Sequence, residues 1–106
     1  MEMNFERIER IKEMLKESPQ DSFLRFALAQ EYTKTNKLED AKNLYQQIVT
    51  DDPDYVGTYY HLGKLLEDND TEKAKQIYQA GIEIAQKKGA SNDLRELLQA
   101  LNNISF

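Results

Sequence analysis

Apolar residues recur at helical spacing along almost the whole chain. The first stripe, between Asn4 and Glu17, consists of Phe5, Ile8, Ile11, Met14 and Leu15. Steps of three or four residues place such positions on one side of a helix. The same test predicts further helices at about 21–35, 38–50, 55–68, 72–88 and 91–103. The pattern therefore predicts an all-α protein of about six helices.

Polar residues and glycine mark the ends of these helices. Asn36 followed by Glu39 predicts a capping box before the third helix, because each side chain can accept the other's backbone amide. Asp70 or Thr71 is predicted to cap the fifth helix, and Asp93 with Glu96 the last one. Gly89 after two lysines predicts the end of the fifth helix.

The central helices fall into two similar pairs. The matches 34 positions apart are Phe26 with Tyr60, Leu28 with Leu62, Ala29 with Gly63 and Tyr32 with Leu66, and those 33 apart are Ala41 with Ala74 and Tyr45 with Tyr78. Such a period is typical of stacked repeats. We predict one domain over 1–106, with repeats at 21–53 and 55–88. Segment 1–18 has the place of a repeat's second helix, and 91–104 is predicted to cap the stack.

These residues resemble the tetratricopeptide repeat family, whose pattern is W-x-x-L-G-x-x-Y, then A-x-x-x-F, then P. The first unit reads Arg25-x-x-Leu28-Ala29-x-x-Tyr32, Ala41-x-x-x-Tyr45, Pro53, and the second reads Tyr59-x-x-Leu62-Gly63-x-x-Leu66, Ala74-x-x-x-Tyr78. Arg25 and Leu66 depart from the pattern, and the second unit lacks the terminal proline. The resemblance covers about residues 22–85 and implies an α-solenoid, a right-handed stack of antiparallel helical hairpins.

The resemblance also implies a concave groove lined by the first helix of each repeat. Helical periodicity turns Phe23, Phe26 and Gln30 about 140° away from the face that carries Leu28. Tyr60 and Lys64 are the equivalents of Phe26 and Gln30 in the second repeat. We expect these five residues to form a peptide-binding groove. The pattern leaves open the alternative that Phe23 and Phe26 pack against the first helix.

Some members of the family hold a partner's C-terminal carboxylate on this face with lysine, asparagine and arginine. The matching positions here are Phe26, Gln30, Tyr60, His61 and Lys64. Only Lys64 is suited to bind a carboxylate, so we do not expect that activity.

Composition narrows the classes of function. The 106 residues carry 19 acidic and 14 basic side chains, and a net charge of −5 argues against a nucleic-acid partner. There is no cysteine, and a single histidine, His61, cannot make an ordinary zinc site. The acidic run at 67–72 lacks the glycine of an EF-hand. No apolar run approaches the roughly 20 residues of a membrane span, and the N-terminus lacks a signal peptide's apolar core. We expect a cytoplasmic protein without cofactor or metal.

The sequence therefore predicts a non-catalytic interaction module, because it shows neither a nucleophile with its base nor a phosphate-binding loop. Its expected partner is a peptide or helical segment of another protein, with no nucleic acid and no membrane involved. A second hypothesis is a structural protein that self-associates as a homodimer. Neither the partner's identity nor the oligomeric state is predicted.

Overall fold

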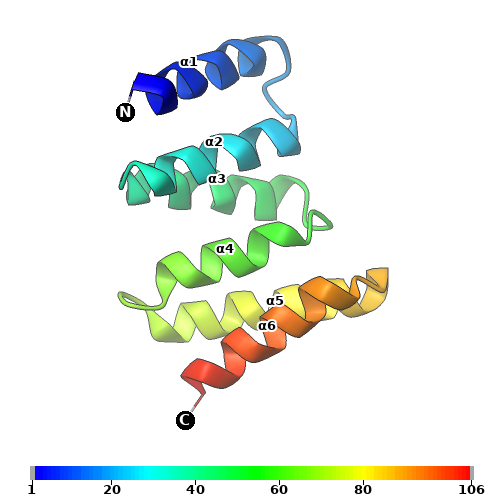
Figure 1. Cartoon of the computed structure of the whole chain (residues 1–106). Coiled ribbons are helices and arrows are strands. Elements are labelled where there is room, and N and C mark those ends of the chain that lie inside the picture. The colour runs from blue at the N-terminus through cyan, green and yellow to red at the C-terminus, as the bar shows by residue number, and fades with distance from the viewer. Residues whose placement is uncertain (1, 106) are drawn as a thin grey trace. The chain divides into compact units, whose positions relative to one another are not determined.

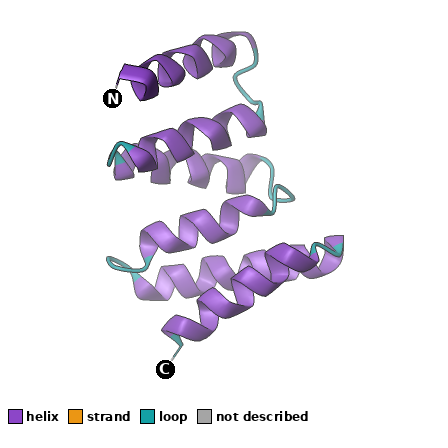
Figure 2. Cartoon of the chain, in the orientation of Figure 1, coloured by secondary structure: helices purple, strands orange, loops and turns teal. Residues whose placement is uncertain are grey.

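The computed structural model describes the backbone of residues 2–105 and the side chains of 5–105. Met1 and Phe106, which the predicted domain includes, lie outside the described residues. The helices are α1 (Glu2–Glu17), α2 (Ser22–Lys34), α3 (Leu38–Asp51), α4 (Gly57–Leu66), α5 (Thr71–Lys88) and α6 (Ser91–Ile104). Figure 2 shows that the described chain is helices joined by short loops, without a strand. The prediction of an all-α protein of about six helices is confirmed.

Several helix ends lie where the polar residues predict them. The Asp21 carboxylate accepts the Leu24 amide of α2 at 3.0 Å. Asp70 accepts the Lys73 amide at the start of α5 at 3.1 Å, which confirms the predicted cap. Gly89 ends α5 in the left-handed conformation, with a φ of 68° that glycine adopts without strain.

Two predicted caps are wrong. Lys37 occupies the cap position of α3 without a side-chain bond, and Asn36 adopts a φ of 63°. Asparagine tolerates this left-handed conformation, so Asn36 serves the turn and forms no capping box. Ala90 stands at the cap of α6, which places Asp93 inside the first turn of the helix.

The chain forms two compact units, residues 1–52 and residues 53–106, called unit 1 and unit 2 below. Unit 1 contains α1, α2 and α3, in which α2 packs against both of the others. Ile8 and Ile11 of α1 and Leu28 of α2 are buried together, with half-buried apolar side chains around them. Figure 1 shows α1 lying along α2. The packing of α1 on α2 follows from the apolar stripes that both helices carry.

Unit 2 contains α4, α5 and α6, which all contact one another. Tyr59, Leu62, Tyr78 and Leu97 are almost fully buried between them. Gly63 lies directly under the Tyr78 ring, and a β-carbon at this position would overlap the ring. At Gly81 an added β-carbon would lie 2.5 Å from Cβ of Tyr59. The two glycines therefore let aromatic side chains from the facing helix approach the backbone.

Buried charges connect the helices of unit 1. Arg25 is 3% exposed, and its guanidinium donates to Asp51 at 2.9 Å and to the Gln20 carbonyl at 3.2 Å. Glu31 is also buried, and Arg7 of α1 approaches its carboxylate at 3.2 Å. These contacts join α2 to α3 and α1 to α2. The sequence shows Arg25 at the first position of the repeat pattern, but it gives no signal for its partner or for the Arg7 and Glu31 pair.

Candidate functional site

A depression in unit 2 lies between α4 and α6, and we call it the α4–α6 hollow. Its volume is about 290 Å³. The residues that line it are Tyr60, Lys64, Glu96, Gln99, Ala100 and Asn103. Two of the five predicted groove residues, Tyr60 and Lys64, are therefore brought together here. The α6 residues were not predicted as part of a site.

Helical geometry explains how these side chains meet. Tyr60 and Lys64 are four residues apart on α4, and Glu96, Ala100 and Asn103 are spaced by four and three on α6. Leu62 on the opposite side of α4 is fully buried, and Gly63 packs on the Tyr78 ring of α5. One side of α4 therefore remains for the hollow. The spacing of these three residues could have predicted that α6 contributes to a site. The same helix also carries an apolar stripe, which indicated instead that α6 covers the end of the stack.

The hollow combines one aromatic ring with several polar groups. The Lys64 ammonium lies 5.9 Å from the centre of the Tyr60 ring, within the range of a cation–π contact. It also lies 3.6 Å from the Glu67 carboxylate, and its side chain remains 47% exposed. Glu96, Gln99 and Asn103 add acceptors and donors on the α6 side. Such a surface can stack on an apolar side chain while it hydrogen-bonds a peptide backbone.

His61 borders this region from the neighbouring position of α4. Its ring meets the Tyr60 ring edge to face, with the centres 5.5 Å apart. Burial lowers the pKa of His61 below its ordinary value, and the nearby Glu96 carboxylate opposes that shift. The imidazole is therefore neutral at pH 7.

The three other predicted groove residues lie on α2 in unit 1. Phe26 is half-buried and meets the Tyr45 ring of α3 edge to face, with the centres 5.6 Å apart. Gln30 is half-buried. Phe23 is 66% exposed and lies beside side chains of α1. Thus Phe26 packs on α3, whereas Phe23 stays largely open to solvent. Whether all five residues line one groove stays a prediction.

The described part of the chain lacks two other features, a metal-binding cluster and a membrane-spanning helix. Within it, no group of three or more His, Cys, Asp or Glu side chains could hold a metal ion. Among the same residues, no helix has the length and apolar character needed to cross a membrane.

Comparison with known proteins supplies relatives at the level of structure. The sequence matches no protein-family model, and no curated protein matches it. The crystal structure of a tetratricopeptide repeat domain protein from Salinibacter ruber shares 48% identity and superposes with a TM-score of 0.77, over 79% of this chain and 94% of the other. A solution NMR structure of a tetratricopeptide repeat domain protein from the same organism shares 48% identity with a TM-score of 0.77. The match covers 82% of this chain and 89% of the other. The solution structure of a protein from Bordetella parapertussis shares 27% identity with a TM-score of 0.78, over 92% of this chain and 86% of the other.

Proposed function

Since the chain belongs to the tetratricopeptide repeat family, we propose that it binds a peptide or helical segment of another protein through the α4–α6 hollow. Membership in this family supports a protein-interaction module in general. The observation that carries the finer proposal is the pair of half-buried Tyr60 and exposed Lys64, opposite a row of polar side chains on α6. Aromatic side chains with a polar rim are typical anchors of protein interfaces.

The chemistry of the hollow supports binding and offers little for catalysis. Its ionisable groups are Tyr60, Lys64 and Glu96. Lys64 is held near Glu67 and stays exposed, so it lacks the desolvated surroundings of a catalytic lysine. Glu96 is likewise exposed. We therefore propose a non-catalytic role for this surface.

Peptide selection followed by mapping tests the proposal. Peptides selected on the immobilised wild-type chain would be titrated into it and into a Tyr60→Ala variant. We expect the variant to bind at least about tenfold more weakly, because truncation of a dominant interface aromatic typically removes about 2 kcal/mol or more, and tenfold corresponds to about 1.4 kcal/mol. Phe5→Ala is the matched control, since Phe5 is an exposed aromatic in unit 1. Equal affinities for wild type and Tyr60→Ala would contradict the proposal.

Self-association is a second candidate, favoured by one feature of α6. Leu97 follows Leu62 by 35 positions, so Leu98 corresponds to Gly63 and to Ala29 of the first repeat. Those two residues are buried, whereas Leu98 is 49% exposed. An exposed leucine at this position can pack against a second copy of the chain.

Sedimentation distinguishes the two candidates. If α6 forms a dimer, Leu98→Asp should yield a monomer with unchanged helicity, because a charge on an apolar contact must be desolvated. Leu38→Asp is the control, since Leu38 is 44% exposed at the start of α3. A wild-type chain that stays monomeric at high concentration would exclude self-association and leave the peptide-binding proposal untouched.

A further inference from the structure

Unit 1 contains a second depression, between α1 and α2, which we call the α1–α2 cleft. Its floor is formed by Ile11, Met14, Phe23, Leu24 and Ala27, and its volume is about 270 Å³. Binding pockets for small molecules start near 300 Å³, so the cleft has room for one or two side chains of a partner. It lies within unit 1 and shares no residue with the α4–α6 hollow.

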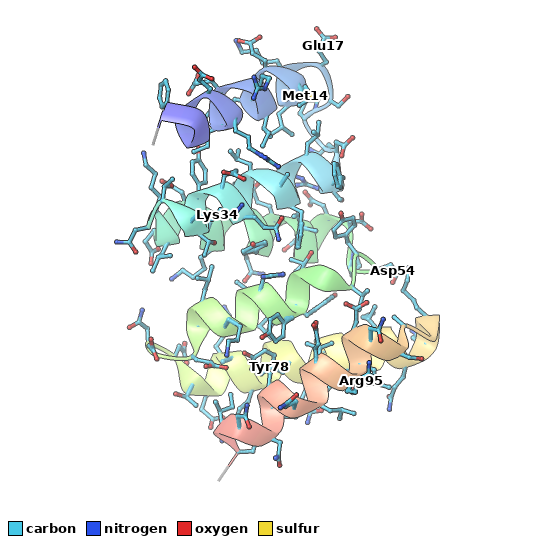
Figure 3. The ribbon with its side chains drawn as sticks, viewed as in Figure 1. Met14, Glu17, Lys34, Asp54, Tyr78 and Arg95 are labelled. Carbon is cyan, nitrogen blue, oxygen red and sulfur yellow. The ribbon has the colours of Figure 1, made fainter. Side chains whose placement is uncertain are left out.

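The floor of the cleft exposes large apolar side chains to water. Phe23 is 66% exposed and Met14 is 47% exposed, whereas Ile11 below them is buried. Figure 3 shows Met14 on the side of α1 that faces α2, while Glu17 points away. Exposed apolar side chains from two helices that converge on one depression are characteristic of a binding surface, whereas single exposed residues are ordinary.

The charged residues that line the cleft are all cationic, although the chain as a whole carries a net charge of −5. Arg7 and Arg10 stand one turn apart along its edge. Arg7 contacts the buried Glu31 through its Nε and still leaves 62% of its side chain exposed, so its position is held while its surface stays open. Arginine is well suited to binding carboxylates there, because its planar guanidinium offers several donors.

Three acidic side chains of α1 border other depressions. Glu6, Glu9 and Glu13 border a separate shallow depression together with Phe5, and Arg10 reaches that depression as well. None of these glutamates lines the α1–α2 cleft. Among these neighbours, Glu9 pairs with Lys12 and Glu13 with Lys16, so the positive charge of Arg7 and Arg10 on the cleft is not offset by a carboxylate that lines it.

We propose that the α1–α2 cleft binds an acidic segment of a partner protein, with a large apolar side chain seated between Met14 and Phe23. The carboxylates that flank this side chain in the segment contact Arg7 and Arg10. The apolar contact supplies affinity, and the two arginines select acidic over basic partners. This inference goes beyond the proposed function, because it concerns a different surface and a partner of stated chemistry.

An array of short peptides with blocked ends tests this inference on the full chain. Each peptide carries phenylalanine or leucine flanked by glutamates, by lysines or by serines, and one series has serine in place of the apolar residue. We expect binding of the acidic apolar peptides only, weakened by added salt. Equal binding of the lysine-flanked series, or no binding of the acidic apolar series, would overturn the inference.

Matched variants locate the binding. Phe23→Ser and Arg10→Glu should each weaken binding of the acidic apolar peptide by at least about tenfold. Phe5→Ser and Lys16→Glu are the controls, because Phe5 is 65% exposed and the Lys16 side chain 73% exposed outside the cleft. We expect less than about twofold change for both controls.

A third comparison separates this surface from the α4–α6 hollow. Tyr60→Ala should leave binding of the acidic apolar peptide unchanged. If binding is instead lost in Tyr60→Ala and retained in Phe23→Ser, the peptide occupies the hollow. That result would overturn the inference and support the proposed function. Circular dichroism and thermal melting of every variant confirm that an observed loss of affinity does not reflect unfolding.

Discussion

The two units meet the same structural requirement with different chemistry at one repeat position. Arg25 in unit 1 and Tyr59 in unit 2 are 34 positions apart and both are buried. The Arg25 guanidinium donates to the Gln20 carbonyl at 3.2 Å and to Asp51. The Tyr59 hydroxyl donates to the Pro53 carbonyl at 2.6 Å. Each side chain therefore closes the turn that precedes its own helix.

This comparison shows what the position demands. It needs a long, mostly apolar body that fills the inner face of the helix and a donor at its tip that reaches back to the preceding turn. Arginine, tyrosine and the tryptophan of the family pattern all end in such a donor. Arg25 is thus an alternative solution to the same requirement, although it departs from the pattern in residue type.

Truncation of the two side chains is expected to have the largest effect on stability. Tyr59→Ala removes a buried aromatic ring and should cost about 3–5 kcal/mol. Arg25→Ala should cost about 2–4 kcal/mol, because it removes a buried stem and leaves Asp51 without its guanidinium. Unfolding by urea measures both values. A loss below about 0.5 kcal/mol for Arg25→Ala, typical of surface sites, would show that the two positions are not equivalent.

The small residues of the two repeats sharpen the comparison. Gly63→Ala should destabilise the protein by about 1–3 kcal/mol, because the added carbon overlaps the Tyr78 ring. At an unconstrained helical glycine, the same change would instead stabilise the protein by about 1 kcal/mol. Ala29→Gly at the matching position should lose about 1 kcal/mol from helix propensity alone. Thermal melting gives the sign directly, and a higher melting temperature for Gly63→Ala would contradict the tight packing.

The hydroxyl of Tyr78 provides a smaller test. It donates to the Glu67 carboxylate at 2.6 Å from a fully buried ring, and Figure 3 labels this tyrosine within unit 2. Burial, followed by the bond to Glu67, raises the pKa of Tyr78 well above its ordinary value. Tyr78→Phe should cost about 1–2 kcal/mol in urea unfolding, since it removes one charge-assisted hydrogen bond and keeps the ring. Tyr45→Phe is the matched change in unit 1, where burial raises the pKa of Tyr45 to about 12.

The smallest expected effect is a dependence of stability on pH. Burial lowers the pKa of folded His61, so the unfolded chain binds a proton more readily. Stability should be full above the unfolded pKa of about 6.5 and fall as the pH drops toward the folded value. His61→Gln should reduce this slope between pH 7.5 and pH 5.5 in urea titrations. An unchanged slope would show that other groups set it.

Much of the fold could be predicted, because helical periodicity and the repeat act over many residues at once. The predicted helices lie within two residues of the observed ends, and the repeat-matched Tyr45 and Tyr78 are both buried. The caps at Asn36 and Asp93 failed because a capping pattern is short and occurs by chance.

The candidate site was only partly predictable. Tyr60 and Lys64 share a hollow, but its α6 side depends on tertiary packing that no local pattern reports. The same holds for the Arg7 and Glu31 contact, which joins residues of two different helices. Phe23 and Phe26 looked equivalent on α2, yet only Phe26 meets a ring from α3. Separating them required knowledge of the neighbouring helix.

The packing of each helix on helices close to it in the chain bears on how the protein folds. In both units every major helix contact joins neighbours or, for α4 and α6, elements separated by one helix. Closing such short loops has a small entropic cost, so helical repeats of low contact order fold rapidly. Folding can therefore begin within either unit. A chain of this kind can acquire much of its structure while its C-terminal helices are still being synthesised on the ribosome.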